Sequence, residues 1–122
     1  MPGKKVLIIE DNEQNLYLIT YLLENSGYEV TPARDGAQGC AMAEVVQPDV
    51  ILLDIQLPGM DGYEVAKALR KKPLVKETPI VAVTSYAMPG DKEKALSAGC
   101  TGYIEKPIDP AVFIDQLEEH LV

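Results

Sequence analysis

The chain has 122 residues, of which 47% are hydrophobic and 25% charged, a composition that indicates one folded domain over residues 1–122 and excludes a disordered chain. Eleven lysines and arginines against nineteen aspartates and glutamates give a net charge of −8, which repels nucleic-acid phosphates and anionic lipid, so neither is expected as a direct partner. No apolar run exceeds four residues, which is too short for a membrane span or a secretion signal, and we expect a cytoplasmic protein.

Short apolar runs alternate along the chain with longer amphipathic stretches, the pattern of helices that cross over between parallel strands. The predicted strands are residues 6–9, 29–33, 50–53, 80–83 and 102–105. The predicted helices are a helix that starts at residue 61 and those at residues 12–26, 36–46, 91–98 and 110–121. The third strand is apolar without alternation, which is typical of a central strand covered on both faces.

Several predicted helix ends carry recognisable signals. Asp61 and Asp109 are predicted N-caps, because a carboxylate at this position accepts a hydrogen bond from a free backbone N–H group. Pro110 fits the first position of the last helix, where no N–H group is needed. Gly27 and Gly99 are predicted to end two helices, since glycine readily takes the left-handed conformation.

These elements predict an α/β fold, a (βα)5 flavodoxin-like, doubly wound parallel sheet with strand order 2-1-3-4-5. Helices on both faces require the strand order to reverse once. Ligands of such sheets bind beyond the carboxyl ends of the strands, at this reversal. The functional residues are therefore expected directly after the strands.

The residues that follow the predicted strands are polar, and parallel strands bring them to one edge of the sheet. They are Glu10, Asp11, Asp54, Thr84, Ser85, Glu105 and Lys106. Each of them alone has a plain structural explanation, such as capping a helix. Asp54 argues against that explanation, since it directly follows four apolar strand residues, where an unpaired carboxylate is costly to desolvate.

Glu10, Asp11 and Asp54 would place three negative charges close together, which requires compensating cations. Lys106 returns one positive charge, and a divalent ion would return the other two. Two cysteines and one histidine cannot form a zinc site of the usual kind, whereas carboxylate oxygens suit Mg²⁺. A carboxylate beside Mg²⁺, a hydroxyl group and a lysine could carry out phosphoryl transfer, with the carboxylate as the nucleophile.

Four motifs lie at successive strand ends. They are I-I-E-D-N at residues 8–12, L-L-D-I-Q-L-P-G-M-D-G at 52–62, V-T-S at 83–85 and Y-I-E-K-P at 103–107. Together they resemble the receiver domain of two-component response regulators, and the chain is similar to the chemotaxis-type single-domain regulators. The resemblance extends over essentially the whole chain.

The resemblance implies that Asp54 accepts a phosphoryl group from a histidine kinase or a phosphotransfer protein and becomes an aspartyl phosphate. It implies that Asp11 and Asp54 bind Mg²⁺ directly, with the backbone carbonyl of Gln56 as a third ligand. Glu10 would act through a bound water, and its direct contact with the metal is left open, because the family often has the shorter aspartate there. Lys106 would contact a phosphoryl oxygen.

The resemblance also implies a switch. The Thr84 hydroxyl would move to a phosphoryl oxygen, and the ring of Tyr103 would enter the space that it leaves. The surface of the fourth helix, fifth strand and fifth helix would then change and control a downstream protein. The peptide bond before Pro107 would be cis, and Tyr86 would shield the phosphate from water.

We expect no enzymatic turnover beyond the domain's own phosphorylation and dephosphorylation, no output domain in this chain, and a monomer, with a phosphorylation-dependent dimer as the alternative. Three other functions stay open. A flavin- or nucleotide-binding module is disfavoured by the carboxylates of the first loop. An aspartyl-phosphate hydrolase is disfavoured because Gln56 stands where such enzymes place a general acid. The third is a receiver-like domain that binds partners without being phosphorylated.

Overall fold

The computed structural model describes residues 3–57, 61–84 and 90–121, in which strands and helices alternate as the sequence predicts. The strands are β1 (Lys5–Ile9), β2 (Glu29–Ala33), β3 (Val50–Asp54), β4 (Ile80–Thr84) and β5 (Gly102–Glu105). The helices are α1 (Glu13–Asn25), α2 (Gly36–Val46), α3 (Gly62–Arg70), α4 (Asp91–Ser97) and α5 (Phe113–Glu119). The strand boundaries therefore agree with the predicted ones to within a residue.

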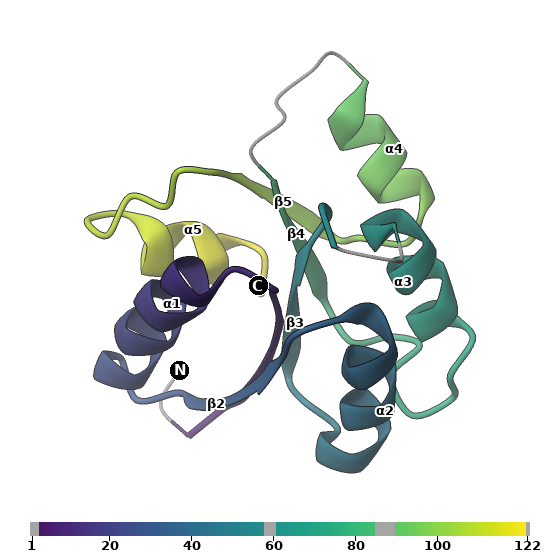
Figure 1. Cartoon of the computed structure of the whole chain (residues 1–122), viewed down its shortest axis with the longest axis horizontal. Helices are drawn as coiled ribbons and strands as arrows, with labels where there is room; N and C mark the ends of the chain where they lie inside the picture. The colour runs from purple at the N-terminus through teal and green to yellow at the C-terminus, as the bar shows by residue number, and fades with distance from the viewer. Residues whose placement is uncertain (1–2, 58–60, 85–89, 122) are drawn as a thin grey trace.

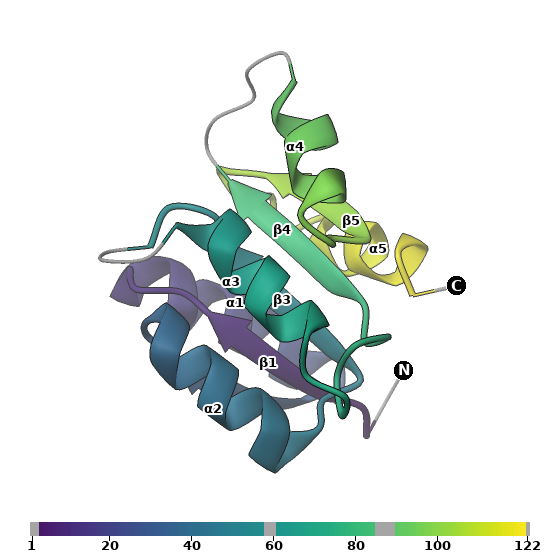
Figure 2. The ribbon, with the colours of Figure 1, turned by 90° about the vertical axis from the view of Figure 1, so that its right-hand side faces the viewer.

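The strands form one parallel sheet in the order β2-β1-β3-β4-β5, which confirms the predicted doubly wound fold. Helices α1 and α5 cover one face of the sheet, and α2, α3 and α4 cover the other (Figure 1). Figure 2 places α2 and α3 in front of the sheet, with α1 and α5 behind it. The strand order reverses between β1 and β3, so the predicted site lies at the carboxyl ends of these strands.

The central strands send alternate side chains into two separate hydrophobic clusters. From β3, Ile51 and Leu53 pack on the α2 and α3 side, whereas Val50 and Leu52 pack on the α1 and α5 side. All four side chains are almost completely buried. Because each such side chain stabilises the fold by about 1.5–3 kcal/mol, the core holds the sheet rigidly beneath its polar strand ends.

Most of the predicted helix ends are confirmed. Asp61 is the N-cap of α3, and its Oδ1 atom accepts a hydrogen bond from the N–H group of Tyr63 at 2.8 Å. Gly27 and Gly99 follow α1 and α4 with φ angles of +90° and +111°, which glycine adopts at little steric cost. None of the helices in the described ranges is long and apolar enough to cross a lipid bilayer, and the expected cytoplasmic location stays a prediction.

The start of α5 differs from the prediction that Asp109 caps the helix and Pro110 begins it. The helix begins at Phe113, with Val112 at the N-cap position. The preceding residues form a turn, in which the Asp109 carboxylate accepts a hydrogen bond from the N–H group of Ala111 at 3.0 Å. The φ angle of −126° at Val112 lies outside the helical range, which accounts for the later start.

Candidate functional site

The carboxyl ends of β1, β3 and β4 lie side by side at one edge of the sheet. Three polar side chains are buried there, since Glu10 is 1% exposed, Thr84 is 2% exposed and Asp54 is 3% exposed. Burying a carboxylate is costly unless it is paired. The three buried polar side chains lie next to an apolar core, and they therefore mark this edge as the candidate functional site, as the sequence predicts.

Glu10, Asp11 and Asp54 form an acidic cluster, in which carboxylate oxygens of the three residues lie within 4.8 Å of one another. The sheet brings them together because Ile9 and Leu53, which directly precede Glu10 and Asp54, are register neighbours. Asp11 is exposed, whereas the other two acids are buried. The structure thus places all three predicted carboxylates in one cluster that solvent can reach.

Among the described residues, Lys106 supplies the positive charge at this cluster. Its Nζ atom lies 2.9 Å from Oε1 of Glu10 and 3.4 Å from Oδ1 of Asp54, and its side chain is only 10% exposed. Limited exposure strengthens both attractions, because less water screens them. Since β4 lies between β3 and β5 in the sheet, the lysine reaches these acids across the end of β4.

Backbone N–H groups supply further hydrogen bonds to the two buried carboxylates. The N–H group of Gln56 donates to Oδ1 of Asp54 at 3.0 Å, and that of Asn12 donates to Oε2 of Glu10 at 3.2 Å. Both donors belong to the loops that follow β3 and β1. The sequence does not indicate these bonds, because almost any residue type at either position would supply the same backbone donor.

The pKa of Asp54 is raised to about 6. Burial is the main cause, and a side-chain hydrogen bond with Glu10 and the charge of Glu10 raise the pKa further. The bond from the Gln56 N–H group and the charge of Lys106 act in the opposite direction. The charge of Lys106 therefore does not fully offset the burial of Asp54 and the charge of Glu10, and a bound cation would further favour the ionised form of Asp54.

The ligand atoms available at this edge fit Mg²⁺. They are hard carboxylate oxygens, and no cysteine or histidine is among the described residues that line the site. The site is an open hollow of about 550 Å³, whose lining includes the acidic cluster together with Asn12, Asn15, Gln56, Lys106 and Pro107. Two added positive charges would balance three carboxylates and one lysine, as the sequence analysis expects.

Thr84 and Tyr103, the predicted switch residues, lie on neighbouring strands. The N–H group of Lys106 donates to the carbonyl oxygen of Thr84 at 2.7 Å, so β4 and β5 stay paired up to the site. Tyr103 is the register partner of Ala82, two residues before Thr84, and its half-buried side chain packs against the cluster on the α2, α3 and α4 side. The bond between Lys106 and Pro107 is cis, as the resemblance implies.

Not every candidate residue joins the acidic cluster. Ser85 and Tyr86 lie outside the described residues, so the shielding role of Tyr86 stays a prediction. Glu105 is exposed and lines a hollow between α4, β5 and α5 instead. Gly62 is a residue for which the sequence predicts no role, and its N–H group donates to the carbonyl oxygen of Ile55 at 3.0 Å. A glycine directly after a helix N-cap was the one local signal of this close contact.

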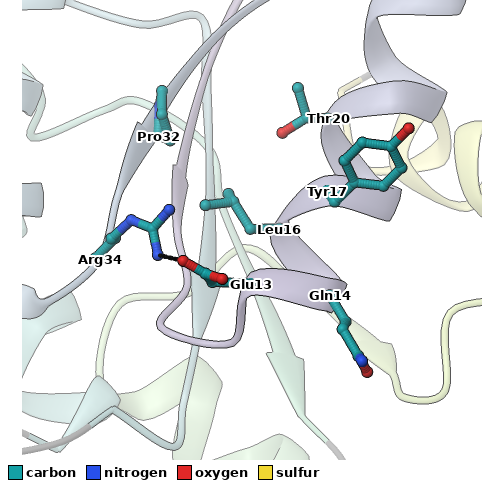
Figure 3. Close-up of a pocket in the computed structure, with 7 residues that line it drawn as sticks. All are labelled: Glu13, Gln14, Leu16, Tyr17, Thr20, Pro32 and Arg34. Atoms are coloured by element: carbon teal, nitrogen blue, oxygen red, sulfur yellow. Dashed lines mark hydrogen bonds and ion pairs between the residues drawn. The ribbon is translucent and has the colours of Figure 1, made fainter.

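A second hollow, of about 600 Å³, lies between α1 and β2 (Figure 3). Leu16, Tyr17 and Pro32 line it, and an ion pair of 3.0 Å joins Arg34 to Glu13. Both partners of this pair are exposed, so it contributes little to stability. None of the described residues that line the hollow is a glycine, and it therefore lacks the phosphate-binding loop of a flavin or nucleotide site.

Known proteins resemble this chain over nearly its whole length. The family model of the response regulator receiver domain matches residues 6–118. The polar-differentiation response regulator DivK of Brucella anthropi is 43% identical over 118 residues, which cover 97% of this chain and 96% of DivK. The chemotaxis response regulator CheY4 of Vibrio cholerae has a TM-score of 0.92 at 33% identity, with 97% of this chain and 98% of CheY4 covered.

A further solved structure bears on the metal. The receiver domain of the sensor histidine kinase PA1611 from Pseudomonas aeruginosa has a TM-score of 0.88 at 36% identity, with 98% of each chain covered. That domain has a magnesium ion coordinated in its active site cleft.

Ligands of doubly wound sheets bind at the carboxyl ends of the strands, and the carboxylates and the lysine found there are the kinds of groups that position and neutralise a phosphoryl group. The chain belongs to the response regulator receiver domain family of two-component systems. The resemblance carried by the four motifs is thereby confirmed.

Proposed function

We propose that this domain is a signalling switch in which Asp54 accepts a phosphoryl group from a histidine kinase or a phosphotransfer protein. The observation that carries the proposal is the buried Asp54 carboxylate, which shares Lys106 with Glu10 at the open edge of the sheet. Membership of the receiver family supports the same function, and the similar proteins DivK and CheY4 are themselves response regulators.

A carboxylate oxygen of Asp54 acts as the nucleophile. It bonds to phosphorus while the bond from phosphorus to the donor's histidine nitrogen breaks, and that nitrogen takes up a proton. The N–H group of Gln56, 3.0 Å from Oδ1, holds the carboxylate in one orientation. Lys106, 3.4 Å from the same oxygen, is close enough to neutralise a phosphoryl oxygen as the group arrives.

When bound, Mg²⁺ supplies most of the charge neutralisation for the phosphoryl oxygens. Asp11, Asp54 and the backbone carbonyl of Gln56 would hold the ion directly. Glu10 is engaged by Lys106 at 2.9 Å, which favours a contact with the metal through water rather than a direct one. The magnesium ion in the similar PA1611 receiver domain supports the same cofactor here.

Phosphorylation changes the partner-binding surface through Thr84 and Tyr103. The Thr84 hydroxyl moves to a phosphoryl oxygen, and the ring of Tyr103 enters the space that it leaves, so the phosphorylated domain favours a second arrangement. Tyr103 lines a groove of about 800 Å³ between α4, β5 and α5, together with Leu96 and Gln116. A downstream protein that binds this groove would therefore distinguish the two arrangements.

Phosphorylation by a small donor tests the proposal. Phosphoramidate with Mg²⁺ should give wild type one acyl phosphate, detected by ³¹P NMR, and EDTA should prevent it. Asp54→Asn should remain unlabelled, whereas the matched control Asp115→Asn, which changes an exposed acid of α5, should be labelled like wild type. Equal labelling of Asp54→Asn would contradict the proposal.

A hydrolase would behave differently in the same preparation. Such an enzyme should release many phosphates per chain from p-nitrophenyl phosphate. We expect no such turnover, because the side-chain amide of Gln56 cannot act as a general acid for the leaving group. Sustained release that is lost in Asp54→Asn would favour the hydrolase over the switch.

A further inference from the structure

We propose that Gly62 is a positioning residue for the metal-binding loop, because only a residue without a side chain allows α3 to begin directly against the backbone of Asp54 and Ile55. The inference rests on the proposed function and extends it to a residue that is neither a ligand nor a catalytic group. Gly62 is buried and is the first residue of α3.

The contact at Gly62 leaves no room for a methyl group. A Cβ atom there would lie 2.4 Å from Cα of Ile55 and 2.8 Å from the carbonyl oxygen of Asp54. Both distances are far below the roughly 3.5–4.0 Å of an ordinary van der Waals contact. The obstructing atoms belong to the backbone, so they cannot turn away as the end of a side chain can. Ile55 is also held from the other side, since its N–H group donates to the carbonyl oxygen of Val83 at 3.2 Å.

The same contact closes the loop that contains Gln56. The N–H group of Gly62 donates to the carbonyl oxygen of Ile55 at 3.0 Å, which ties the end of the loop to its beginning. Gln56 is the next residue, its N–H group orients Asp54, and its carbonyl is the third protein ligand in the proposed function. Leu57 anchors the loop in the core, where it is almost completely buried. A shift of Ile55 would therefore move the carbonyl of Gln56 and the carboxylate of Asp54 together.

The test compares Gly62→Ala with Gly102→Ala. Gly102 begins β5 and is also buried, but a methyl group there would meet side-chain atoms of His120, the nearest being Cγ at 2.5 Å, and not the backbone of the loop after β3. We expect Gly62→Ala to raise the Kd for Mg²⁺, measured by isothermal titration calorimetry, by about tenfold or more, because small displacements of a site are amplified in its function. Gly102→Ala should stay within about twofold of wild type.

Two further measurements distinguish a positioning role of Gly62 from a general loss of stability. The Tm of each variant shows how much stability it has lost. The rate of phosphorylation by phosphoramidate should fall in Gly62→Ala at limiting Mg²⁺ and recover substantially at saturating Mg²⁺. A folded Gly62→Ala variant with a wild-type Kd would overturn the inference, and so would an equal rise in Kd for Gly102→Ala. Wild type that neither binds Mg²⁺ nor is phosphorylated would instead overturn the proposed function itself.

Hydrogen exchange in wild type tests the same link without any substitution. Mg²⁺ should slow exchange of the Gly62 N–H group several-fold, because the ion and the bond to Ile55 stabilise the same loop. Gly99 lies just beyond the end of α4, and its N–H group donates to the carbonyl oxygen of Leu96. Exchange of this N–H group should be unaffected by Mg²⁺. Binding of Mg²⁺ without slower exchange at Gly62 would overturn the inference even where Gly62→Ala fails to fold.

Discussion

Lys106 lies closer to Glu10 than to the proposed phosphoacceptor, with its Nζ atom 2.9 Å from Oε1 of Glu10 and 3.4 Å from Oδ1 of Asp54. Among the described residues, Lys106 supplies the positive charge at this edge of the sheet, and Glu10 is its nearer partner. Burial raises the pKa of Asp54, and the hydrogen bond with Glu10 and the charge of Glu10 raise it further, against the opposing charge of Lys106. The acids and the lysine form one charge system, so a change at any member should alter the others.

Glu10→Gln should lower the pKa of Asp54 in the metal-free protein. The substitution removes the negative charge that raises this pKa and releases Lys106 to pair with Asp54. Carboxyl ¹³C NMR in EDTA measures the titration directly. Glu13→Gln, a change at an exposed acid on α1, is the control and should leave the titration unchanged. An unaltered Asp54 titration in Glu10→Gln would contradict the coupling.

Asp54→Asn should exceed wild type in metal-free stability by an amount that grows between about pH 4 and pH 7. Because the pKa of Asp54 is raised to about 6, the folded state binds this proton more tightly than the unfolded state. Wild type thus loses stability as the pH rises through this window, by up to about 3 kcal/mol, whereas the amide does not titrate.

Urea unfolding in EDTA at several pH values gives this difference directly. Added Mg²⁺ should reduce it, since the ion stabilises the ionised wild-type site. A difference that stays constant across the pH range would mean that Asp54 titrates alike in the folded and unfolded states.

Arg70→Leu should lower the free energy of unfolding by about 3 kcal/mol, because several carbonyl oxygens, two of them partly buried, would lose a charged donor. The Arg70 guanidinium donates to the carbonyl oxygens of Gly99 at 2.8 Å, Thr78 at 2.7 Å and Lys76 at 2.9 Å. It thereby links the end of α3 to the loops before β4 and β5. Urea denaturation measures the loss, and Lys71→Leu at an exposed neighbour should change it by less than about 0.5 kcal/mol. If Arg70→Leu lost no more stability than Lys71→Leu, water would be shown to replace the hydrogen bonds of the arginine.

Tyr28→Phe should lower the free energy of unfolding by about 1 kcal/mol at neutral pH. The buried Tyr28 hydroxyl donates to Oε2 of Glu118 at 2.7 Å, which ties α5 to the start of β2. This bond lowers the pKa of Glu118, so its contribution is present above the usual carboxyl pKa and is lost as the pH falls through the lower folded-state value. In urea unfolding, the difference in unfolding free energy between wild type and Tyr28→Phe should therefore be smaller at acid pH. The control Tyr21→Phe, at an exposed tyrosine, should differ little from wild type at any pH.

The sequence predicts the architecture and the acidic cluster well, because both follow from the alternation of strands and helices. Strand ends that carry Glu10 and Asp54 must meet at one edge once the strands are parallel. The preference of Lys106 for Glu10 depends on distances across several strands, which no local pattern encodes. The partners of Arg70 are carbonyl oxygens, which every residue has. The prediction that Asp109 caps α5 is wrong because the same carboxylate can cap a turn as well as a helix.

The site of phosphorylation is the central claim, and peptide mapping tests it most directly. Wild type treated with phosphoramidate and Mg²⁺, then reduced with borohydride, should yield homoserine at position 54 and leave Asp11 and Asp61 unchanged. The control without Mg²⁺ should yield aspartate at all three positions. Reduction at another acid, or none at Asp54 in folded and Mg²⁺-loaded protein, would contradict the assignment of Asp54 as the phosphoacceptor.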